Sequence, residues 1–231
     1  MAEGDLVVER ALTAGLRPRA ALTDARNPAA IIGSLPPDVP VYAADDEARR
    51  MLTGLGVALD VIALFERPTP SDPSRLMDES RRIVLLEEVD NPTNVGTIAR
   101  STVALGADAL LLDTVSSDPL SRRALRVSMG VSLSAPHARV ANPVTAVEEM
   151  LALGYVVFGL TPDPCADDIE VHRVAGDRRT AIVLGSERRG LSDDMLAVVP
   201  HRVRIPMRTG VDSLNVAAAA AIAAHDLFRT R

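Results

Sequence analysis

Apolar residues occur along the chain in a pattern that predicts an α/β protein. From about residue 80 onward, short uninterrupted apolar runs, such as Ile83–Leu86, Ala109–Leu112 and Ala181–Leu184, alternate with segments of helical periodicity. Uninterrupted apolar strands are typical of a mostly parallel sheet that helices cover on both faces. We therefore expect that architecture. The other strands expected are Tyr155–Leu160 and Val203–Ile205, and the expected helices are Val95–Leu105, Ser121–Ser128, Pro143–Leu153 and Val216–Phe228.

The first 67 residues predict a separate, small α/β module. The expected helices are Leu6–Ala14 and Asp45–Leu52, and the expected strands are Ala20–Thr23, Val39–Tyr42 and Val57–Phe65. Pro68, Pro70 and Pro73 then follow within six residues, which is typical of a linker between domains. The predicted organisation is an accessory domain at 1–67, a linker at 68–80 and a main domain at 81–231.

The composition is that of an ordinary globular protein, with 47% hydrophobic and 24% charged residues in a chain of 231. No apolar run approaches the roughly 20 residues of a membrane span, and the acidic N-terminus is unlike a secretion signal. Cys165 is the single cysteine, and no Cys or His pair has metal-ligand spacing. We expect a cytoplasmic protein that binds neither a metal nor a membrane.

The net charge of −6 argues against a bulk electrostatic grip on nucleic acid. All 25 basic residues are arginine, however, so every cation is a fork-shaped donor suited to phosphate. The chain has three Phe, two Tyr and no Trp, which makes recognition of bases on an aromatic platform improbable. Any contact with nucleic acid is therefore expected to be local.

Three polar segments lie where a strand should pass into a helix, which is where open α/β sheets bind ligands. They are Asn94-Val95-Gly96 with Arg100, Leu184-Gly185-Ser186-Glu187 with Gly190, and Ile205-Pro206-Met207 followed by Ser213-Leu214-Asn215. The chain has neither a dinucleotide fingerprint nor a phosphate loop, which disfavours a dehydrogenase or a P-loop enzyme. The apolar side chains of Leu191, Met207 and Leu214 suit a neutral adenosine better than a polyphosphate.

These segments extend into three motifs that carry a family resemblance. Motif one is Asp90–Arg100, motif two is Ile182–Ser192, and motif three is Ile205–Met207 with Ser213–Val216. In this order and spacing, the chain resembles the SpoU-type RNA ribose 2′-O-methyltransferases of the SPOUT superfamily over residues 81–231. Residues 1–67 resemble, less specifically, the ribosomal-protein-like accessory domain of that family. That domain usually has a longer segment before its first helix, so we expect an N-terminally shortened version here.

The resemblance implies a fold and partners that the apolar pattern alone does not predict. It implies that the C-terminal segment threads through a loop to form a deep trefoil knot, a feature that general fold rules make rare. It also implies binding of S-adenosyl-L-methionine, a homodimer, and a structured RNA substrate, either rRNA or tRNA. DNA is not expected as a substrate, because it lacks the 2′-hydroxyl.

The resemblance also assigns roles to individual residues. Arg100 is the expected catalytic residue; because a guanidinium stays charged in proteins, we favour a clamp on phosphate and developing alkoxide over a base. Asn94, Glu187, Ser213 and Asn215 are expected beside it in the catalytic site, although Asn94 could simply cap its helix, Glu187 could charge the next turn, and Ser213 and Asn215 could begin the last helix. The expected cofactor-binding residues are Leu184, Gly185, Ser186, Glu187, Gly190, Ile205, Met207, Ser213, Leu214 and Asn215. The expected RNA-binding residues are Arg122, Arg123, Arg126, Arg229 and Arg231, for which a solvated surface or a frayed tail is the alternative.

The sequence thus predicts an S-adenosylmethionine-dependent RNA 2′-O-ribose methyltransferase. One alternative is a non-catalytic RNA-binding or ribosome-assembly protein that keeps the knotted fold. The intact set of Asn94, Arg100, Glu187, Ser213 and Asn215 argues against it. The other alternative is a SPOUT relative that methylates a base, which the Ser213-Leu214-Asn215 segment disfavours.

Overall fold

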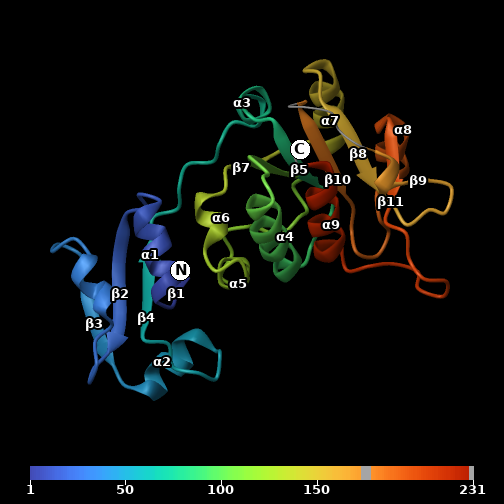
Figure 1. The fold of residues 1–231 in the computed structure, drawn as a ribbon. Helices are drawn as coiled ribbons and strands as arrows, with labels where there is room; N and C mark the ends of the chain where they lie inside the picture. Colours follow the sequence, from blue (N-terminus) through green and yellow to red (C-terminus); the bar gives the residue numbers. More distant parts are fainter. Residues whose placement is uncertain (173–177, 229–231) are drawn as a thin grey trace. The chain divides into compact units, whose positions relative to one another are not determined.

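The chain folds into two compact units in a computed structural model, which describes residues 1–172 and 178–228. The first unit comprises Met1–Thr69 and a later segment, Leu120–Ser134. The second comprises Pro70–Pro119 and the chain from Ala135 onward. Figure 1 shows both units in sequence colours. No helix within the described ranges is long and apolar enough to cross a membrane.

The first unit is built on a four-stranded sheet with the order β1-β4-β2-β3. Its strands are β1 (Ala2–Glu3), β2 (Pro18–Asp24), β3 (Val41–Ala44) and β4 (Val61–Phe65). Its helices are α1 (Asp5–Thr13), the 3₁₀ helix η1 (Ala30–Ser34), α2 (Asp46–Thr53), α5 (Arg122–Val127) and α6 (Val131–Ser134). Val8 of α1, Val61 of β4 and Leu125 of α5 meet in one apolar core. The first unit thus combines helices with a four-stranded sheet, of which the sequence analysis did not anticipate β1.

The sequence analysis placed Leu120–Ser134 in a continuous main domain at 81–231, but in the structure this segment is part of the first unit. It belongs to the first unit because Leu125 is buried in that unit's core and because two arginines bind Glu3. The Glu3 side chain is only 1% exposed. Arg122 donates from Nε to its Oε1 at 2.9 Å, and Arg126 donates to its Oε2 at 2.7 Å. An apolar contact and a buried ion pair thus hold the two stretches of chain together.

The second unit contains a seven-stranded sheet with the order β7-β6-β5-β10-β8-β11-β9, in which every neighbouring pair is parallel. The strands are β5 (Arg82–Leu86), β6 (Ala109–Leu112), β7 (His137–Arg139), β8 (Val156–Leu160), β9 (Asp167–Asp168), β10 (Thr180–Leu184) and β11 (His201–Arg204). The helices are α3 (Pro73–Glu79), α4 (Pro92–Ala104), α7 (Pro143–Ala152), the 3₁₀ helix η2 (Ile169–Val171), α8 (Asp193–Val198) and α9 (Val216–Leu227). The predicted parallel sheet is confirmed.

Alternate residues of the central strands enter two separate cores, which explains their uninterrupted apolar sequences. Val84 and Leu86 of β5 pack with α4 and α9, which lie side by side in Figure 1. Ile83 and Leu85 of the same strand pack on the opposite face with α3, α7 and α8. Helices therefore cover both faces of the sheet, as expected from the apolar runs.

The segment 68–80 was predicted to be a linker, but most of its second half is helix α3. Asp72 caps the helix by accepting hydrogen bonds from the backbone N–H groups of Ser74 and Arg75, and Pro73 occupies the first turn. Met77 is 2% exposed in the core of the second unit. The prolines of this segment thus begin a packed helix as well as interrupting the chain.

Candidate functional site

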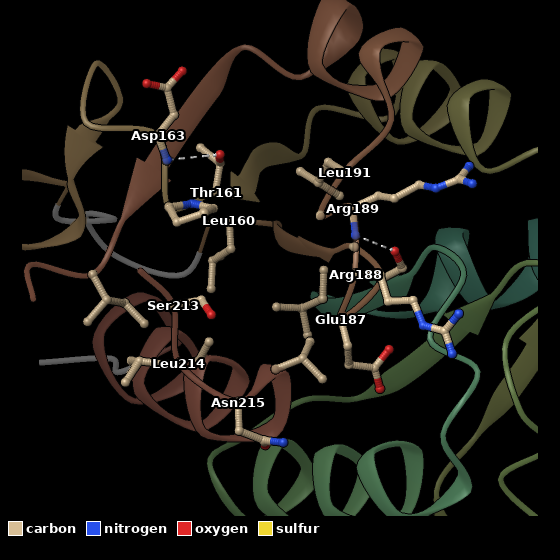
Figure 2. Close-up of a pocket in the computed structure, with 18 of the residues that line it drawn as sticks. Leu160, Thr161, Asp163, Glu187, Arg188, Arg189, Leu191, Ser213, Leu214 and Asn215 are labelled. Carbon is tan, nitrogen blue, oxygen red and sulfur yellow. Dashed lines mark hydrogen bonds between the residues drawn. The ribbon is translucent and has the colours of Figure 1, made fainter. Parts of the chain in front are cut away.

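A cavity of about 630 Å³ opens at the carboxyl ends of β8, β10 and β11 in the second unit. Figure 2 shows its walls, which come from the loops after these strands and from the start of α9. This is the edge where parallel α/β sheets bind ligands. All ten residues predicted to bind the cofactor line the cavity: Leu184, Gly185, Ser186, Glu187, Gly190, Ile205, Met207, Ser213, Leu214 and Asn215.

The loop after β10 is a tight turn that forms one wall. The Ser186 N–H donates to the Gly190 carbonyl at 3.0 Å, and the Gly190 N–H donates back to the Ser186 carbonyl at 2.9 Å. The Arg189 N–H also donates to Ser186 Oγ at 3.2 Å, as Figure 2 shows. A Cβ at Gly185 would overlap the backbone of Gly190 and Leu191. Glycine at 185 is therefore required by the close approach of two backbone segments.

A chain of side-chain hydrogen bonds joins the three motifs. Asn94 of α4 donates from Nδ2 to Glu187 Oε1 at 2.5 Å, and Asn215 donates from Nδ2 to Asn94 Oδ1 at 3.1 Å. The Asn215 Oδ1 accepts from the Ala217 N–H at 2.9 Å. Because a carboxylate only accepts, the bond to Glu187 fixes which way the Asn94 amide is turned. The cavity wall is thus tied to α4, which carries Arg100.

The network decides between the alternatives for two asparagines. Asn91 caps α4 by accepting from the Thr93 N–H at 2.9 Å, so Asn94 lies inside the first turn and is 7% exposed. The idea that Asn94 merely caps its helix is therefore wrong. Asn215, in contrast, is the N-cap of α9 and also bonds to Asn94. Its capping and its place in the network coexist.

Arg100 is exposed on α4 and does not line the cavity. It follows Asn94 by six residues, which corresponds to about 600° of helix rotation, so the two side chains leave α4 in different directions. Within residues 1–172 and 178–228, Arg100 has neither a hydrogen-bond nor an ion-pair partner. Its guanidinium is thus available to a ligand, and its catalytic role stays a prediction.

The predicted RNA-binding arginines have different surroundings. Arg122 and Arg126 bind Glu3 within the first unit, although their side chains remain 42% and 33% exposed. Arg123 is exposed on the same helix. Arg229 and Arg231 lie outside the described residues. The ion pairs give Arg122 and Arg126 a structural role, and their contact with RNA stays a prediction.

The sequence analysis missed the part of the cavity that follows β8. Leu160, Thr161, Pro162 and Asp163 line it, and the Asp163 N–H donates to Thr161 Oγ1 at 3.2 Å (Figure 2). The strand itself was predicted to end at Leu160. Since parallel strands present their carboxyl ends at one edge, the residues after 160 could have been added to the site by that rule.

Comparison with known proteins agrees with this geometry. The model of the SpoU rRNA methylase family matches residues 81–225, which contain all three motifs and most of the second unit. The chain belongs to the SpoU rRNA methylase family. It is thus a methyltransferase, and motifs two and three line the cavity described above.

Individual proteins resemble the chain over nearly its whole length. An uncharacterized tRNA/rRNA methyltransferase of Mycobacterium bovis is 35% identical over 232 aligned residues, which cover 100% of this chain and 81% of the relative. The SpoU methyltransferase AviRb from Streptomyces viridochromogenes, solved in complex with the cofactor AdoMet, superimposes with a TM-score of 0.82 at 25% identity, covering 97% of this chain and 87% of that one. A protein described as an RNA 2′-O ribose methyltransferase superimposes with a TM-score of 0.78 at 26% identity, covering 97% and 85% of the two chains.

Proposed function

We propose that this protein transfers a methyl group from S-adenosyl-L-methionine to a ribose 2′-hydroxyl of structured RNA, either rRNA or tRNA. The observation that carries the proposal is that motifs two and three line one cavity, and that Asn94 of motif one, 93 and 121 residues away in sequence, is hydrogen-bonded to Glu187 and Asn215 in its wall. The resemblance to AviRb supports the cofactor, and the resemblance to an RNA 2′-O ribose methyltransferase supports the ribose as acceptor.

The cavity has the size and chemistry expected for S-adenosylmethionine. Its volume of about 630 Å³ falls within the range of roughly 300–1,000 Å³ typical of small-molecule sites. Leu191, Ile205 and Leu214 supply apolar walls for an adenine, and the turn at Gly185 brings backbone groups close to the cavity. Ser213 lies on the same wall and provides a side-chain hydroxyl, whereas the Asn215 amide is bonded to Asn94 and to the start of α9.

S-adenosylmethionine supplies an electrophilic methyl group, whose transfer leaves a neutral thioether and so does not require a metal. The residues of the chain must then hold the ribose, align its hydroxyl and assist the loss of its proton. Arg100 is suited to bind the adjacent phosphate and to stabilise negative charge that develops on the hydroxyl oxygen, because its guanidinium is exposed and remains charged. Asn94 positions α4, and hence Arg100, relative to Glu187 and Asn215.

The proposal includes the remaining family features. The C-terminal segment forms a deep trefoil knot around the cofactor cavity, and a homodimer completes the site. Residues 1–67, together with Leu120–Ser134 of the same unit, bind the RNA. Contacts to RNA come from Arg122, Arg123, Arg126, Arg229 and Arg231. The enzyme acts in the cytoplasm. Sedimentation of the purified protein tests the dimer: a mass of one chain at all concentrations would contradict it.

The decisive experiment is transfer of a tritium-labelled methyl group to total RNA from a strain that lacks this protein. We expect label in rRNA or tRNA, at a single nucleotide whose 3′ phosphodiester bond resists alkaline hydrolysis, because a 2′-O-methyl group prevents attack by the ribose oxygen. DNA of the same sequence should take up none. Protein inactivated by heat is the control for background label, and Arg100→Ala should transfer little label.

Each other outcome contradicts the proposal in a different way. Label on a base would assign the protein to the base-methylating relatives. Absence of label from both rRNA and tRNA, with RNA still bound tightly, would favour the non-catalytic RNA-binding alternative. Failure of the protein to bind S-adenosylmethionine in a calorimetric titration would remove the basis of any methyl transfer.

A further inference from the structure

Glu87 is a buried acid that lies outside the three motifs. It contacts the residues on either side of loop 185–191, the cofactor loop, which lines the cavity. It follows β5 directly and is 6% exposed. Its backbone N–H donates to the Leu184 carbonyl at 2.9 Å, immediately before the loop 185–191. Its carboxylate accepts from the Ser192 N–H at 3.0 Å and from Ser192 Oγ at 2.7 Å, immediately after the loop.

The contacts of Glu87 use donors that have few other acceptors. The Ser192 N–H lies at the start of α8, where backbone N–H groups lack partners within the helix. Ser192 Oγ accepts from the Met195 N–H at 3.1 Å, and its own hydrogen is free to bond to Glu87. Hydrogen bonds from neutral donors to a buried carboxylate are stronger than bonds between neutral groups. Both oxygens of the Glu87 carboxylate are thus committed to Ser192.

The loop held in this way forms part of the cavity wall. Gly185, Glu187 and Leu191 all line the cavity, and Leu191 is 6% exposed. The turn has its own cross-link between Ser186 and Gly190, so it is rigid internally. Its position relative to β5 and α8, in contrast, depends on what holds residues 184 and 192. Glu87 makes a hydrogen bond to each of those two residues.

We propose that Glu87 is a positioning residue that fixes the cofactor loop and thereby sets the affinity for S-adenosylmethionine. The inference rests on the proposed function, since it assumes that the cavity binds this cofactor. A loop that is already in place spares the cofactor the entropic cost of ordering it. Glu87 does not line the cavity, so its effect must pass through the loop.

The test compares Glu87→Ala, which removes both side-chain bonds, with Glu87→Gln, which keeps one good acceptor. Cofactor affinity is measured by calorimetry with the full chain, at a temperature where circular dichroism shows each variant to be folded. We expect Glu87→Ala to raise the Kd about 10-fold or more and Glu87→Gln to raise it by a smaller factor. Glu148→Gln, an exposed position on α7, is the matched control and should leave the Kd unchanged.

Kinetics and hydrogen exchange separate positioning from mere stability. At saturating cofactor, Glu87→Gln should keep most of the wild-type kcat, because the groups that act on the ribose are untouched. The amides of Ser186, Arg189 and Gly190, which are hydrogen-bonded in the turn, should exchange faster in Glu87→Gln without a matching change in the amides of β5. Ser192→Ala should resemble Glu87→Gln, since it removes one of the same two bonds.

An unchanged Kd in Glu87→Gln and Ser192→Ala would overturn the proposal, as would a kcat that stays low at saturating cofactor. If the wild-type protein fails to bind S-adenosylmethionine, the proposed function fails. The exchange measurement still decides the role of Glu87 in that event, because unchanged protection of the loop amides would show that it does not hold the loop.

Discussion

Asn94 uses the two atoms of its amide in opposite ways, and this makes its role testable. Nδ2 donates to Glu187, and Oδ1 accepts from Asn215. Asn94→Asp would place a second acid against Glu187, so we expect cofactor affinity to fall about 10-fold or more. Adding Glu187→Gln should restore it, because the new amide donates to Asp and the pattern of donors and acceptors becomes complementary again. Calorimetric Kd values for both single variants and the double variant provide the measurement.

The control for this pair is Asn142→Asp, which keeps an oxygen acceptor at the N-cap of α7 and should bind the cofactor normally. If the double variant binds as weakly as Asn94→Asp alone, the Glu187 carboxylate has a direct role that an amide does not replace. The positional account of the network would then be wrong.

Arg100 carries the sharpest prediction for catalysis. Arg100→Ala should lower methyl transfer about 100-fold or more while leaving the Kd for S-adenosylmethionine within twofold, because Arg100 does not line the cavity. Arg75→Ala removes another exposed helical arginine, which pairs with Glu79, and should have wild-type activity. The measurement is the rate of methyl transfer by the wild type and both variants at saturating cofactor and RNA. Activity of Arg100→Ala at a tenth of the wild-type rate or more would remove Arg100 from the catalytic role.

At this scale, the sequence predicted positions better than contacts. All ten predicted cofactor residues line one cavity, since motifs two and three mark strand ends that a parallel sheet brings together. The bonds of Asn94 to Glu187 and Asn215 span 93 and 121 residues of sequence, and no local pattern specifies them. Glu87 was missed for the same reason, because an acid after a strand is common and its value here comes from Ser192.

Among the secondary-structure elements, length and polarity determined which ones could be predicted. The central strands β5, β6 and β10 were placed correctly because they are uninterrupted apolar runs buried on both faces. β7 and β9 have three and two residues, and His137, Arg139, Asp167 and Asp168 give them no apolar signal. Their pairing is imposed by the neighbouring strands β6 and β11. Such short strands at sheet edges depend on tertiary context rather than on their own sequence.

The Tyr155 hydroxyl joins the C-terminal end of α3 to the sheet, which makes a prediction at the element scale possible. Tyr155 Oη lies 2.8 Å from the Met77 carbonyl and 2.6 Å from the Ser80 carbonyl, both at the C-terminal end of α3. Tyr155→Phe keeps the packing and removes the donor, so we expect the free energy of unfolding to fall by about 1–2 kcal/mol. Urea unfolding followed by circular dichroism measures the loss, and an unchanged midpoint would show that the hydroxyl does not help to hold α3.

The same hydroxyl predicts a dependence on alkaline pH. Burial raises the pKa of Tyr155 to about 12 from its ordinary value of 10.0. The raised value means that the folded state favours the protonated phenol. Its contribution to stability is therefore complete below pH 10 and is lost as the pH rises toward 12. Tyr155→Phe should show a smaller loss of stability between pH 9 and 11 than the wild type, in urea titrations at each pH. Equal losses of stability in the wild type and in Tyr155→Phe would show that the buried Tyr155 hydroxyl is not the source of the pH dependence.

At the scale of the whole molecule, the chain contributes to the first unit twice. It forms Met1–Thr69, continues into the second unit, and then supplies Leu120–Ser134 to the first unit before completing the second. The core of the first unit therefore combines Val8 and Val61 with Leu125, which is more than sixty residues later in the sequence. Such non-local contacts carry a large loop-closure cost during folding. The sequence analysis placed a boundary at the prolines and could not detect that a later segment crosses it.

This arrangement predicts that the second unit is not independent as a continuous piece. A chain of residues 70–231 alone would keep the segment Leu120–Ser134 but lose its partners. Leu125, now 4% exposed, would face water, and Arg122 and Arg126 would lose Glu3. Exposing one such leucine costs about 1.5–3 kcal/mol and creates an apolar surface. We expect the truncated chain to bind a hydrophobic dye and to form aggregates larger than a dimer in light scattering, while the full chain does neither.

The matched control is Leu125→Ser in the truncated chain, which should lower both dye binding and aggregation if this segment is their source. In the full chain the same substitution should instead destabilise the first unit, because it places a hydroxyl in an apolar core. A truncated chain that is monodisperse, unfolds cooperatively and binds no dye would show that Leu120–Ser134 also packs within the second unit alone. The division of the chain into a discontinuous first unit would then describe geometry without describing how the protein folds.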